Sequence, residues 1–201
     1  MLRLDLRCKR IIDLVGASVA LLLLSPILIL AALAVKVYDG GSVLYRRRCV
    51  GGDGEFDAFK LRSMFVDADR YLEEHPELLS EFQRDYKLKN DPRVTPVGAF
   101  LRRTSIDELP QLFNVLRGEM SLVGPRMVTQ PELEKYGEKR DILLTVKPGM
   151  TGYWQVAGRQ KVGYRERVEM DMYYIRHWSL GLDLRILFKT PWKVLTREGA
   201  H

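Results

Sequence analysis

The chain has 201 residues, enough for one domain of ordinary size with a buried core and a short appendage. Lys and Arg number 32 against 26 Asp and Glu, and the net charge of +6 favours an anionic partner: a phosphate-bearing substrate, an acidic membrane surface or a nucleic acid. The two cysteines, Cys8 and Cys49, predict no disulfide framework and fit a reducing, cytosolic setting. The histidines, His75, His177 and His201, lack the spacing of a zinc site.

The first predicted element is an apolar segment without a charged side chain from Leu14 to Val35. As a helix it is long enough to cross a bilayer core of about 30 Å, so a single-pass anchor is the simplest interpretation. A removable signal peptide fits less well, because the apolar run is too long and no cleavage site of small residues follows it.

Two features of this segment indicate instead a helix that enters the membrane, bends and returns. Pro26 has no N–H for the carbonyl of Leu22 and predicts a kink, while the Ser25 hydroxyl can satisfy a freed carbonyl. Basic residues also flank both ends, which the positive-inside rule places in the cytosol: Arg3, Arg7, Lys9 and Arg10 before the run, Lys36 and residues 46–48 after it. Kinked helices also span membranes, so these residues leave both arrangements open.

The next segment predicts a small β-hairpin followed by a charged, broken helix. Residues 42–50 and 55–61 alternate on either side of a turn formed by residues 51–54. The turn glycines match neither a dinucleotide fingerprint nor a P-loop. Residues 67–89 combine charges with helical spacing of leucines, so we expect a solvent-facing helix that breaks near Pro76.

The densest chemistry surrounds the acidic pair Asp107 and Glu108. If Asp107 is a helix N-cap, Pro110 takes position N3, where its missing N–H costs no bond. The helix then loosens at Gly118 and carries one apolar face made of Leu109, Leu112, Phe113, Leu116 and Met120. Capping alone favours an acidic pair at a helix start, so a structural role competes with a chemical one.

Arginine is concentrated around this pair in a pattern that favours phosphate chemistry. A carboxylate beside such charges and a helix N-terminus is expected to have a depressed pKa and to stay ionised at neutral pH. Asp107 is then suited to attack phosphorus or to bind Mg²⁺. The guanidinium groups, whose forks suit phosphate oxygens, belong to Arg93, Arg102, Arg103, Arg117 and Arg126.

Four ordered blocks of the sequence resemble the monotopic phosphoglycosyl transferases, a family of small bacterial sugar transferases that act on polyprenyl phosphate. The similarity runs from about Lys9 to the C-terminus. The blocks are FKLRSM (59–64), DPRVTPVGAFLRRTSIDELPQLFNVLRGEMSLVGPR (91–126), KPGMTGYWQVAGR (147–159) and DMYYIRHWSLGLDLRIL (171–187).

The resemblance implies an α+β, mainly helical fold at the bacterial inner membrane. Residues 1–38 would form a re-entrant membrane helix hairpin bent at Ser25 and Pro26, with both ends in the cytosol. Residues 39–201 would form a compact cytosolic catalytic domain with amphipathic interfacial helices and the small β-hairpin. Inner-membrane lipids are implied as partners, a homodimer is compatible with the resemblance, and no nucleic acid is implied.

The resemblance also implies a reaction. Asp107 would attack the β-phosphate of a UDP-sugar, release UMP and carry the phosphosugar until polyprenyl (undecaprenyl) phosphate accepts it. Glu108 would assist, and both carboxylates are the expected ligands of Mg²⁺. The expected ligands of substrate phosphate are Arg102, Lys60, Arg62 and Arg126, with Asp171 and Tyr174 as candidates to complete the site. A lone Asp on an amphipathic helix is, however, more often a surface residue.

The C-terminal segment predicts either a membrane-facing platform or an ordinary core helix. Leu180, Leu184, Leu187 and Phe188 share a helical face, and neighbours such as Trp178, Trp192, Arg185, Lys189 and Lys193 suit an interface. The last block looks most similar to hexose-1-phosphate transferases of exopolysaccharide or O-antigen assembly, so glucose or galactose is the expected sugar.

Two positions depart from the family pattern: Cys49 stands where many relatives have arginine, and Met127 where a second proline is usual. Because of these two departures, the family pattern does not determine the contacts with the substrate. A different class of function also competes, namely a membrane-tethered module that binds anionic lipid or nucleic acid without catalysis. The net charge of +6 supports it, but the sequence has no RNP, KH or helix-turn-helix pattern.

Overall fold

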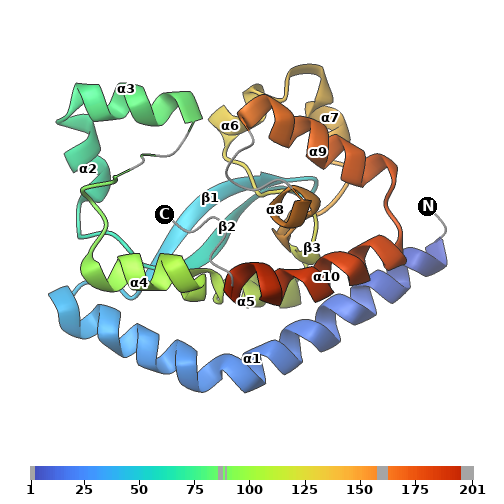
Figure 1. The fold of residues 1–201 in the computed structure, drawn as a ribbon, viewed down its shortest axis with the longest axis horizontal. Helices are drawn as coiled ribbons and strands as arrows, with labels where there is room; N and C mark the ends of the chain where they lie inside the picture. Colours follow the sequence, from blue (N-terminus) through green and yellow to red (C-terminus); the bar gives the residue numbers. More distant parts are fainter. Residues whose placement is uncertain (1–2, 86–87, 89, 158–162, 196–201) are drawn as a thin grey trace.

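The computed structural model describes residues 3–85, 88, 90–157 and 163–195 of the chain. A long helix, α1 (Arg3–Asp39), runs beneath a mainly helical body that contains two small sheets (Figure 1). This arrangement confirms the expected helical fold. The layer of helices above α1 consists of α4 (Pro96–Thr104), α5 (Gln111–Arg117) and α10 (Leu180–Leu195).

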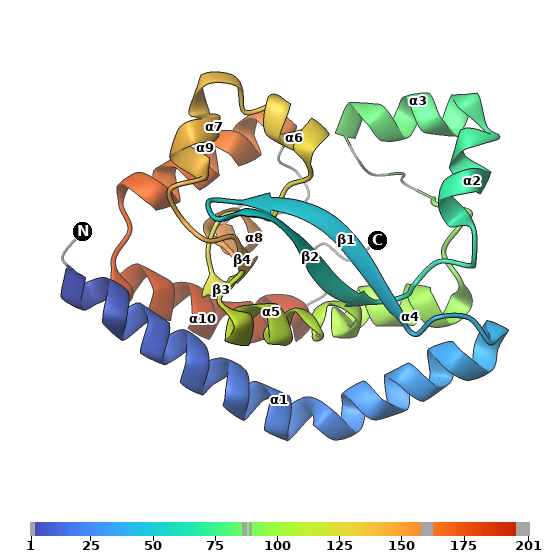
Figure 2. The ribbon, with the colours of Figure 1, turned by 180° about the vertical axis from the view of Figure 1, so that it is seen from behind.

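α1 is one continuous helix, rather than a pair of antiparallel helices, and it bends near its middle (Figures 1 and 2). Pro26 lies inside the helix and has no N–H to donate to the carbonyl of Leu22. The Ser25 hydroxyl donates to that carbonyl at 2.9 Å, as predicted, so the freed acceptor keeps a partner. The bend turns both arms of α1 toward the same body.

Polar side chains fasten both ends of α1 to this body. Near its start, Lys9 pairs with Asp183 of α10, with 2.6 Å between the charged atoms. Arg10 donates to two main-chain carbonyls near the end of α5, at 2.7 and 2.9 Å. At the other end, both oxygens of Asp39 accept hydrogen bonds from the Arg62 guanidinium. Both ends of α1 are therefore fastened to the same body, on the side toward which the helix bends (Figure 1).

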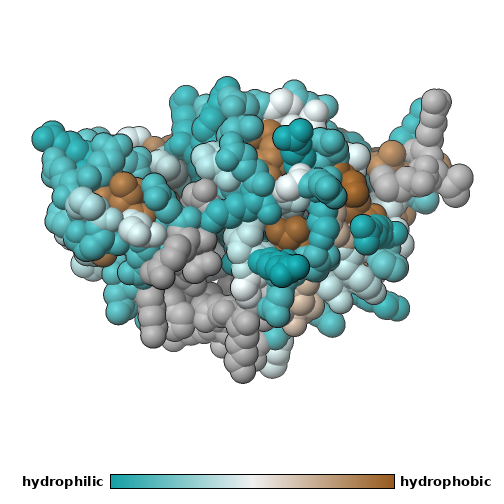
Figure 3. All heavy atoms as spheres, turned by 90° about the horizontal axis from the view of Figure 1, so that it is seen from above, coloured by the Kyte–Doolittle hydropathy of each residue, from teal (hydrophilic) through white to brown (hydrophobic). Residues whose placement is uncertain are grey.

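The outward side of α1 is apolar. Within the part of the chain that the structure describes, Leu4–Asp39 is the one helix long and apolar enough to cross a membrane. Only 11% of the most apolar stretch of this helix is buried inside the protein, whereas the core helix of a soluble protein is mostly buried. Hydrophilic side chains dominate the opposite face of the body (Figure 3). This asymmetry supports association with a membrane.

β1 (Leu44–Gly51) and β2 (Gly54–Leu61) form the predicted antiparallel hairpin, which crosses the middle of the body (Figure 2). The register starts at the pair Leu44 and Leu61 and ends at the pair Gly51 and Gly54. Gly54 has a φ of 111°, a conformation that favours glycine, and so closes the turn without strain.

The main core lies between α1, the hairpin and α5. Cys49 and Met127, the two departures from the family pattern, both belong to it, so they fill the core rather than line a site. Burial raises the pKa of the Cys49 thiol to about 11. Small residues let α1 approach closely, because a Cβ at Gly16 would lie 2.7 Å from a Leu122 methyl carbon. The buried members of this core are Ala17, Cys49, Phe56, Ala58, Leu112, Val115, Met120 and Met127.

The predicted break in the charged helix is confirmed. α2 (Ala68–Glu73) ends before Pro76, and α3 (Pro76–Asp85) starts at that proline. The proline is tolerated there because the first helical residues need no intrahelical N–H partner. The two helices project beside the hairpin (Figure 1).

β3 (Ser121–Val123) and β4 (Gly149–Thr151) pair in parallel and join two distant sequence blocks. The Gly124 N–H donates to the Thr151 carbonyl at 2.9 Å, and the Gly149 N–H donates to the Pro125 carbonyl at 2.8 Å. A Cβ at Gly149 would lie 2.0 Å from the Gly124 nitrogen, so no side chain fits between these main chains. The surrounding helices are α6 (Gln130–Glu134), η2 (Gly137–Lys139), α7 (Arg140–Leu143), α8 (Tyr153–Ala157) and α9 (Tyr164–Arg176).

α10 combines the two interpretations that its sequence left open. Ile186 is buried at 1% exposure, and Leu187, expected on the same face as Phe188, packs against the Ile186 cluster instead. Leu184, Phe188 and Trp192 are exposed on a different side, with Phe188 at 83%. One side of α10 is therefore core and the other presents apolar groups outward.

Replacing Gly98 by alanine tests how tightly α4 is seated. A Cβ at this position would lie 1.9 Å from the Ser63 carbonyl oxygen, so we expect Gly98→Ala to destabilise the fold by about 1–3 kcal/mol. Thermal unfolding in detergent micelles measures this as a lower Tm. Gly181→Ala is the matched control, because a Cβ there meets only the Ser179 hydroxyl at 3.9 Å. Equal Tm values for the two variants would contradict the tight packing.

Candidate active site

The acidic pair follows a helix whose two ends are fixed. At the start of α4, the Thr95 hydroxyl accepts a hydrogen bond from the Gly98 N–H at 2.9 Å. At its end, Ser105 has a φ of 57°, in the left-handed region, so the chain leaves the helix abruptly. A 3₁₀ turn, η1 (Ile106–Glu108), then carries the acidic pair to the wall of a cavity.

The expectation that Asp107 caps the following helix is wrong. α5 begins at Gln111, and Pro110 takes the N-cap position without a side-chain capping bond. The left-handed Ser105 separates α4 from the 3₁₀ turn, and Asp107 lies inside that turn rather than at a helix start. Its carboxylate is therefore not used by local capping.

The predicted apolar face of this segment is confirmed except for one residue. Leu112 and Met120 are buried, and Leu109 and Leu116 pack against their cluster. Phe113 is 47% exposed. It lies about 100° around the helix from Leu112, which is outside the face that meets the core.

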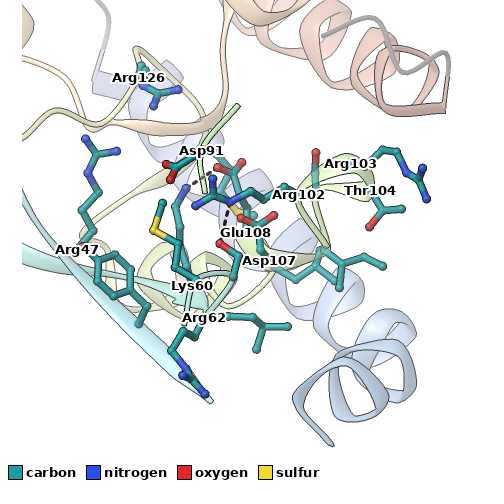
Figure 4. A pocket seen from close by; sticks show the side chains of 18 of the residues that line it. Arg47, Lys60, Arg62, Asp91, Arg102, Arg103, Thr104, Asp107, Glu108 and Arg126 are labelled. Atoms are coloured by element: carbon teal, nitrogen blue, oxygen red, sulfur yellow. Dashed lines mark hydrogen bonds and ion pairs between the residues drawn. The ribbon is translucent and has the colours of Figure 1, made fainter. Parts of the chain in front are cut away.

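Asp107 and Glu108 are neighbours with different surroundings (Figure 4). Asp107 is buried, at 6% exposure. The Glu108 side chain is partly open and pairs with Lys60 of β2, with 2.6 Å between Oε1 and Nζ. Arg102 of α4 lies close to the pair, and its Nε donates to the Ser63 hydroxyl at 2.8 Å. Two elements thus hold fixed positive charge beside the carboxylates.

The depressed pKa expected for Asp107 is also wrong. Burial, followed by the charge of Glu108, raises the pKa of Asp107 from 3.8 to about 6, and the attraction of Lys60 and Arg102 offsets only part of this. Burial also acts to raise the pKa of Glu108, but Lys60 and Arg126 outweigh it, and the pKa lies below its ordinary value. At neutral pH both side chains are mainly carboxylates.

The acidic pair opens into a cavity of about 1860 Å³. This volume exceeds the roughly 300–1,000 Å³ of a typical small-molecule pocket. Basic side chains outnumber acidic ones in its lining. Leu24 and Ile27, which flank the bend of α1, also belong to the lining, as do Leu187 and Pro191 of α10. The cavity thus connects the acidic pair with the apolar helix.

Four of the predicted phosphate ligands line this cavity, but one of them is bonded to the end of α1. Lys60, Arg102 and Arg126 turn toward the acidic pair or the space above it (Figure 4). Arg62 lines the cavity too, yet its guanidinium pairs with Asp39 and donates to the Ser42 carbonyl at 2.6 Å. Its contacts fasten the end of α1 to the body.

Asp171 and Tyr174 lie behind the cavity wall, where both are buried at 1% exposure. Asp171 accepts a hydrogen bond from the Tyr136 hydroxyl at 2.8 Å. The Tyr174 hydroxyl donates to Asp183 at 2.7 Å, next to the ion pair of Lys9. The structure therefore does not bring these two residues into the lining with the acidic pair.

Some residues of the site were not singled out from the sequence. Ser63, which holds Arg102, lies inside the FKLRSM block, but a lone serine carries no chemical signal. Asp91, whose carboxylate accepts two hydrogen bonds of 2.8 Å from the Arg93 guanidinium, likewise carries no signal of its own in the sequence. Arg167 lines the cavity from α9, whose charges are typical of a solvated face.

Comparison with known proteins identifies the family. The model of the bacterial sugar transferase family matches residues 4–197, and the chain belongs to this family. This confirms the resemblance of the four sequence blocks.

Three relatives show how far the similarity extends, and 96% of this chain aligns with each. The "UDP-galactose-lipid carrier transferase" of Erwinia amylovora is 50% identical, and 41% of its length is covered. The "Undecaprenyl-phosphate galactose phosphotransferase" of Salmonella typhimurium is 48% identical, with 41% covered. The "Exopolysaccharide production protein ExoY" of Rhizobium meliloti is 48% identical, with 88% covered. The chain thus spans about two fifths of the first two proteins and most of the third.

The raised pKa of Asp107 predicts that its carboxylate destabilises the fold. Because this pKa is about 6 in the folded protein and ordinarily 3.8, stability is lost as the pH rises through that window. We expect Asp107→Asn to be more stable than the wild type by about 1–3 kcal/mol above pH 7, and to lose this advantage near pH 4. Tm values in detergent micelles across this pH range measure the difference.

Asp53→Asn, in the exposed hairpin turn, is the matched control and should show no such pH dependence. A constant Tm difference between Asp107→Asn and the wild type at all pH values would contradict the burial cost.

Proposed function

We propose that the protein is a phosphoglycosyl transferase that moves a sugar-1-phosphate from a UDP-sugar to undecaprenyl phosphate. One observation carries the proposal: a buried carboxylate, Asp107, lies in a basic cavity that reaches the bend of an apolar helix. The reaction needs one site that both a soluble nucleotide sugar and a lipid phosphate can reach. The names of the Erwinia and Salmonella relatives support this reaction class.

The chemistry follows from the position and charge of Asp107. Its carboxylate oxygen attacks the β-phosphorus, the bond from that phosphorus to the bridging oxygen breaks, and UMP leaves with the electron pair. A phosphate oxygen of the lipid then attacks the same phosphorus and frees the carboxylate. The product is a lipid diphosphate sugar. A pKa of about 6 leaves Asp107 mainly ionised at neutral pH and still more basic than an ordinary aspartate, which suits a nucleophile.

Fixed cations supply the charge stabilisation that phosphoryl transfer needs. Arg102, held by Ser63, and Lys60, paired with Glu108, are placed to hold the β-phosphate while its charge is redistributed. Arg126 faces them across the cavity (Figure 4). Their positions are set by packed elements, so little reorganisation is needed when substrate binds.

We also propose that Asp107 and Glu108 hold Mg²⁺. Among the described residues no group of three or more His, Cys, Asp or Glu side chains gathers to form a metal cage. The pair nevertheless fits this ion, because Mg²⁺ takes one or two protein carboxylates and fills its remaining positions with water and substrate phosphate. Two adjacent, partly desolvated carboxylates also gain from a divalent cation. When bound, the ion would neutralise charge on the diphosphate.

For the membrane, we propose that α1 is re-entrant and keeps the catalytic body on the cytosolic face of the inner membrane. The contacts of Lys9 and Arg10 support this arrangement, because they tie the start of α1 to the body that Arg62 ties to its end. A straight crossing at about 1.5 Å per residue would carry these two ends to opposite membrane surfaces. The exposed Phe188 and Trp192 of α10 suit the interface beside it.

The sugar that we propose is a hexose, glucose or galactose. The names of the Erwinia and Salmonella relatives specify galactose for those proteins. A panel of UDP-glucose, UDP-galactose and UDP-N-acetylhexosamines, assayed for UMP release with undecaprenyl phosphate and Mg²⁺, decides the point. UMP release from the acetamido sugars alone would contradict the hexose assignment.

Asp107→Asn is expected to abolish turnover, because the amide lacks the nucleophilic oxygen, and to prevent formation of a phosphosugar–protein adduct. UMP release measures turnover, and intact-protein mass spectrometry measures the adduct. Asp53→Asn should retain both. Near-normal turnover of Asp107→Asn would remove Asp107 as the nucleophile, and no UMP release by the wild type from any UDP-sugar would remove the transferase function.

Changing Ser25 and Pro26 together to alanine is expected to straighten α1, because the lost i to i−4 hydrogen bond is restored and the steric cause of the kink disappears. We expect part of the population to place residue 1 on the far side of the membrane, measured by accessibility labelling of an N-terminal tag. Replacing Ser42 by alanine, outside α1, should leave the topology unchanged. A tag on the far side already in the wild type would contradict the re-entrant arrangement.

A further inference from the structure

We infer that Arg126 and Arg167 together bind the phosphate of the UMP half of the donor, the group that leaves when Asp107 attacks. This inference rests on the proposed function and adds Arg167 of α9 to the substrate site. It is carried by a cluster of two guanidinium groups and one indole on the cavity wall.

Both arginines have a buried donor without an acceptor. Within the described part of the chain, Nε of Arg126 and Nε of Arg167 make no hydrogen bond, although both atoms are shielded from solvent. An unpaired buried N–H is costly, and most buried polar groups are satisfied. Both residues line the cavity. We expect a phosphate bound in the cavity to draw both side chains outward, so that these N–H groups gain oxygen acceptors.

Trp154 of α8 orients the two guanidinium groups. The Arg167 Cζ atom lies 4.5 Å from the centroid of the Trp154 ring, and the Arg126 Cζ atom lies 5.7 Å from it. Tyr164 gives Arg167 a second aromatic contact at 5.7 Å. Cation–π contacts hold a guanidinium in place without using its N–H groups. The donors therefore stay available for an anion.

The charges of the two guanidinium groups also favour an anionic ligand. Burial, followed by repulsion from Arg126, lowers the pKa of Arg167. The nearby Asp171 attracts Arg167 and offsets part of this repulsion, but its hydrogen bond, at 2.8 Å, comes from the Tyr136 hydroxyl. Two like charges gathered in a partly buried wall gain most from a ligand with two negative oxygens.

The position of Arg126 and Arg167 favours the phosphate of the nucleotide over the phosphate of the lipid as their ligand. Arg126 lies across the cavity from Asp107 (Figure 4), and its charge helps to lower the pKa of Glu108, so it is within electrostatic range of the pair. α9, which carries Arg167, lies on the side of the body away from α1 (Figures 1 and 2). An in-line displacement places the leaving phosphate opposite the nucleophile, on this wall rather than beside the membrane.

Calorimetric titration of the full chain in detergent micelles with UMP and with uridine tests the site. We expect Arg167→Ala to raise the Kd for UMP about tenfold or more and to leave uridine binding unchanged, because only UMP carries the phosphate. Arg165→Ala, exposed on the same helix, removes the same charge and should change the Kd less than about twofold. Arg167→Lys should lie between the wild type and Arg167→Ala, because it keeps the charge but loses the fork.

Three results would overturn the site. Arg167→Ala and Arg165→Ala could bind UMP equally well, or the wild type could bind UMP no more tightly than uridine. In the third, Arg167→Ala would lose affinity for undecaprenyl phosphate but not for UMP. Arg167→Lys decides the question if Arg167→Ala fails to fold. UMP release from UDP-sugar is measured in parallel with the wild type. Normal release with unchanged UMP affinity of the variants overturns only the role of Arg167, whereas no release overturns the proposed function itself.

Discussion

Both ends of α1 are bonded to one body, and this constraint shapes the rest of the molecule. Lys9 reaches Asp183 on α10, Arg10 reaches the end of α5, and Asp39 at the far end meets Arg62. Between these contacts the helix bends beside Ser25, so both of its arms lie against the body (Figure 1). Leu24 and Ile27, next to the bend, line the cavity and bring an apolar surface to the site of charge.

The acidic pair shows how a fold tolerates a costly group. Burial and a like-charged neighbour both act against ionisation of Asp107, and Lys60 and Arg102 compensate only in part. Such a balance leaves a carboxylate that is ionised yet poorly stabilised. The phosphates of the proposed substrates would add to the repulsion, so under that proposal the surrounding cations, rather than the carboxylates, have to organise binding.

Features set by neighbouring residues were predictable from the sequence. The hairpin, the break at Pro76 and the bond from Ser25 to Leu22 depend on local rules and are confirmed. The pKa of Asp107 was predicted in the wrong direction, because charges can be counted in a sequence whereas desolvation depends on residues that pack from elsewhere. For the same reason Tyr174, a site candidate through the resemblance, belongs to a buried network, and Arg167, which the sequence did not single out, lines the cavity.

The contact between Gly124 and Gly149 has a consequence for how this cavity can change by mutation. The loop that carries Arg126 is bonded main chain to main chain, and no side chain can be introduced at the crossing. Mutation therefore has few ways to reshape this wall gradually. If the proposed function is correct, we expect sugar preference to change through the other walls of the cavity, because the wall proposed to hold the donor phosphate tolerates few substitutions at this crossing.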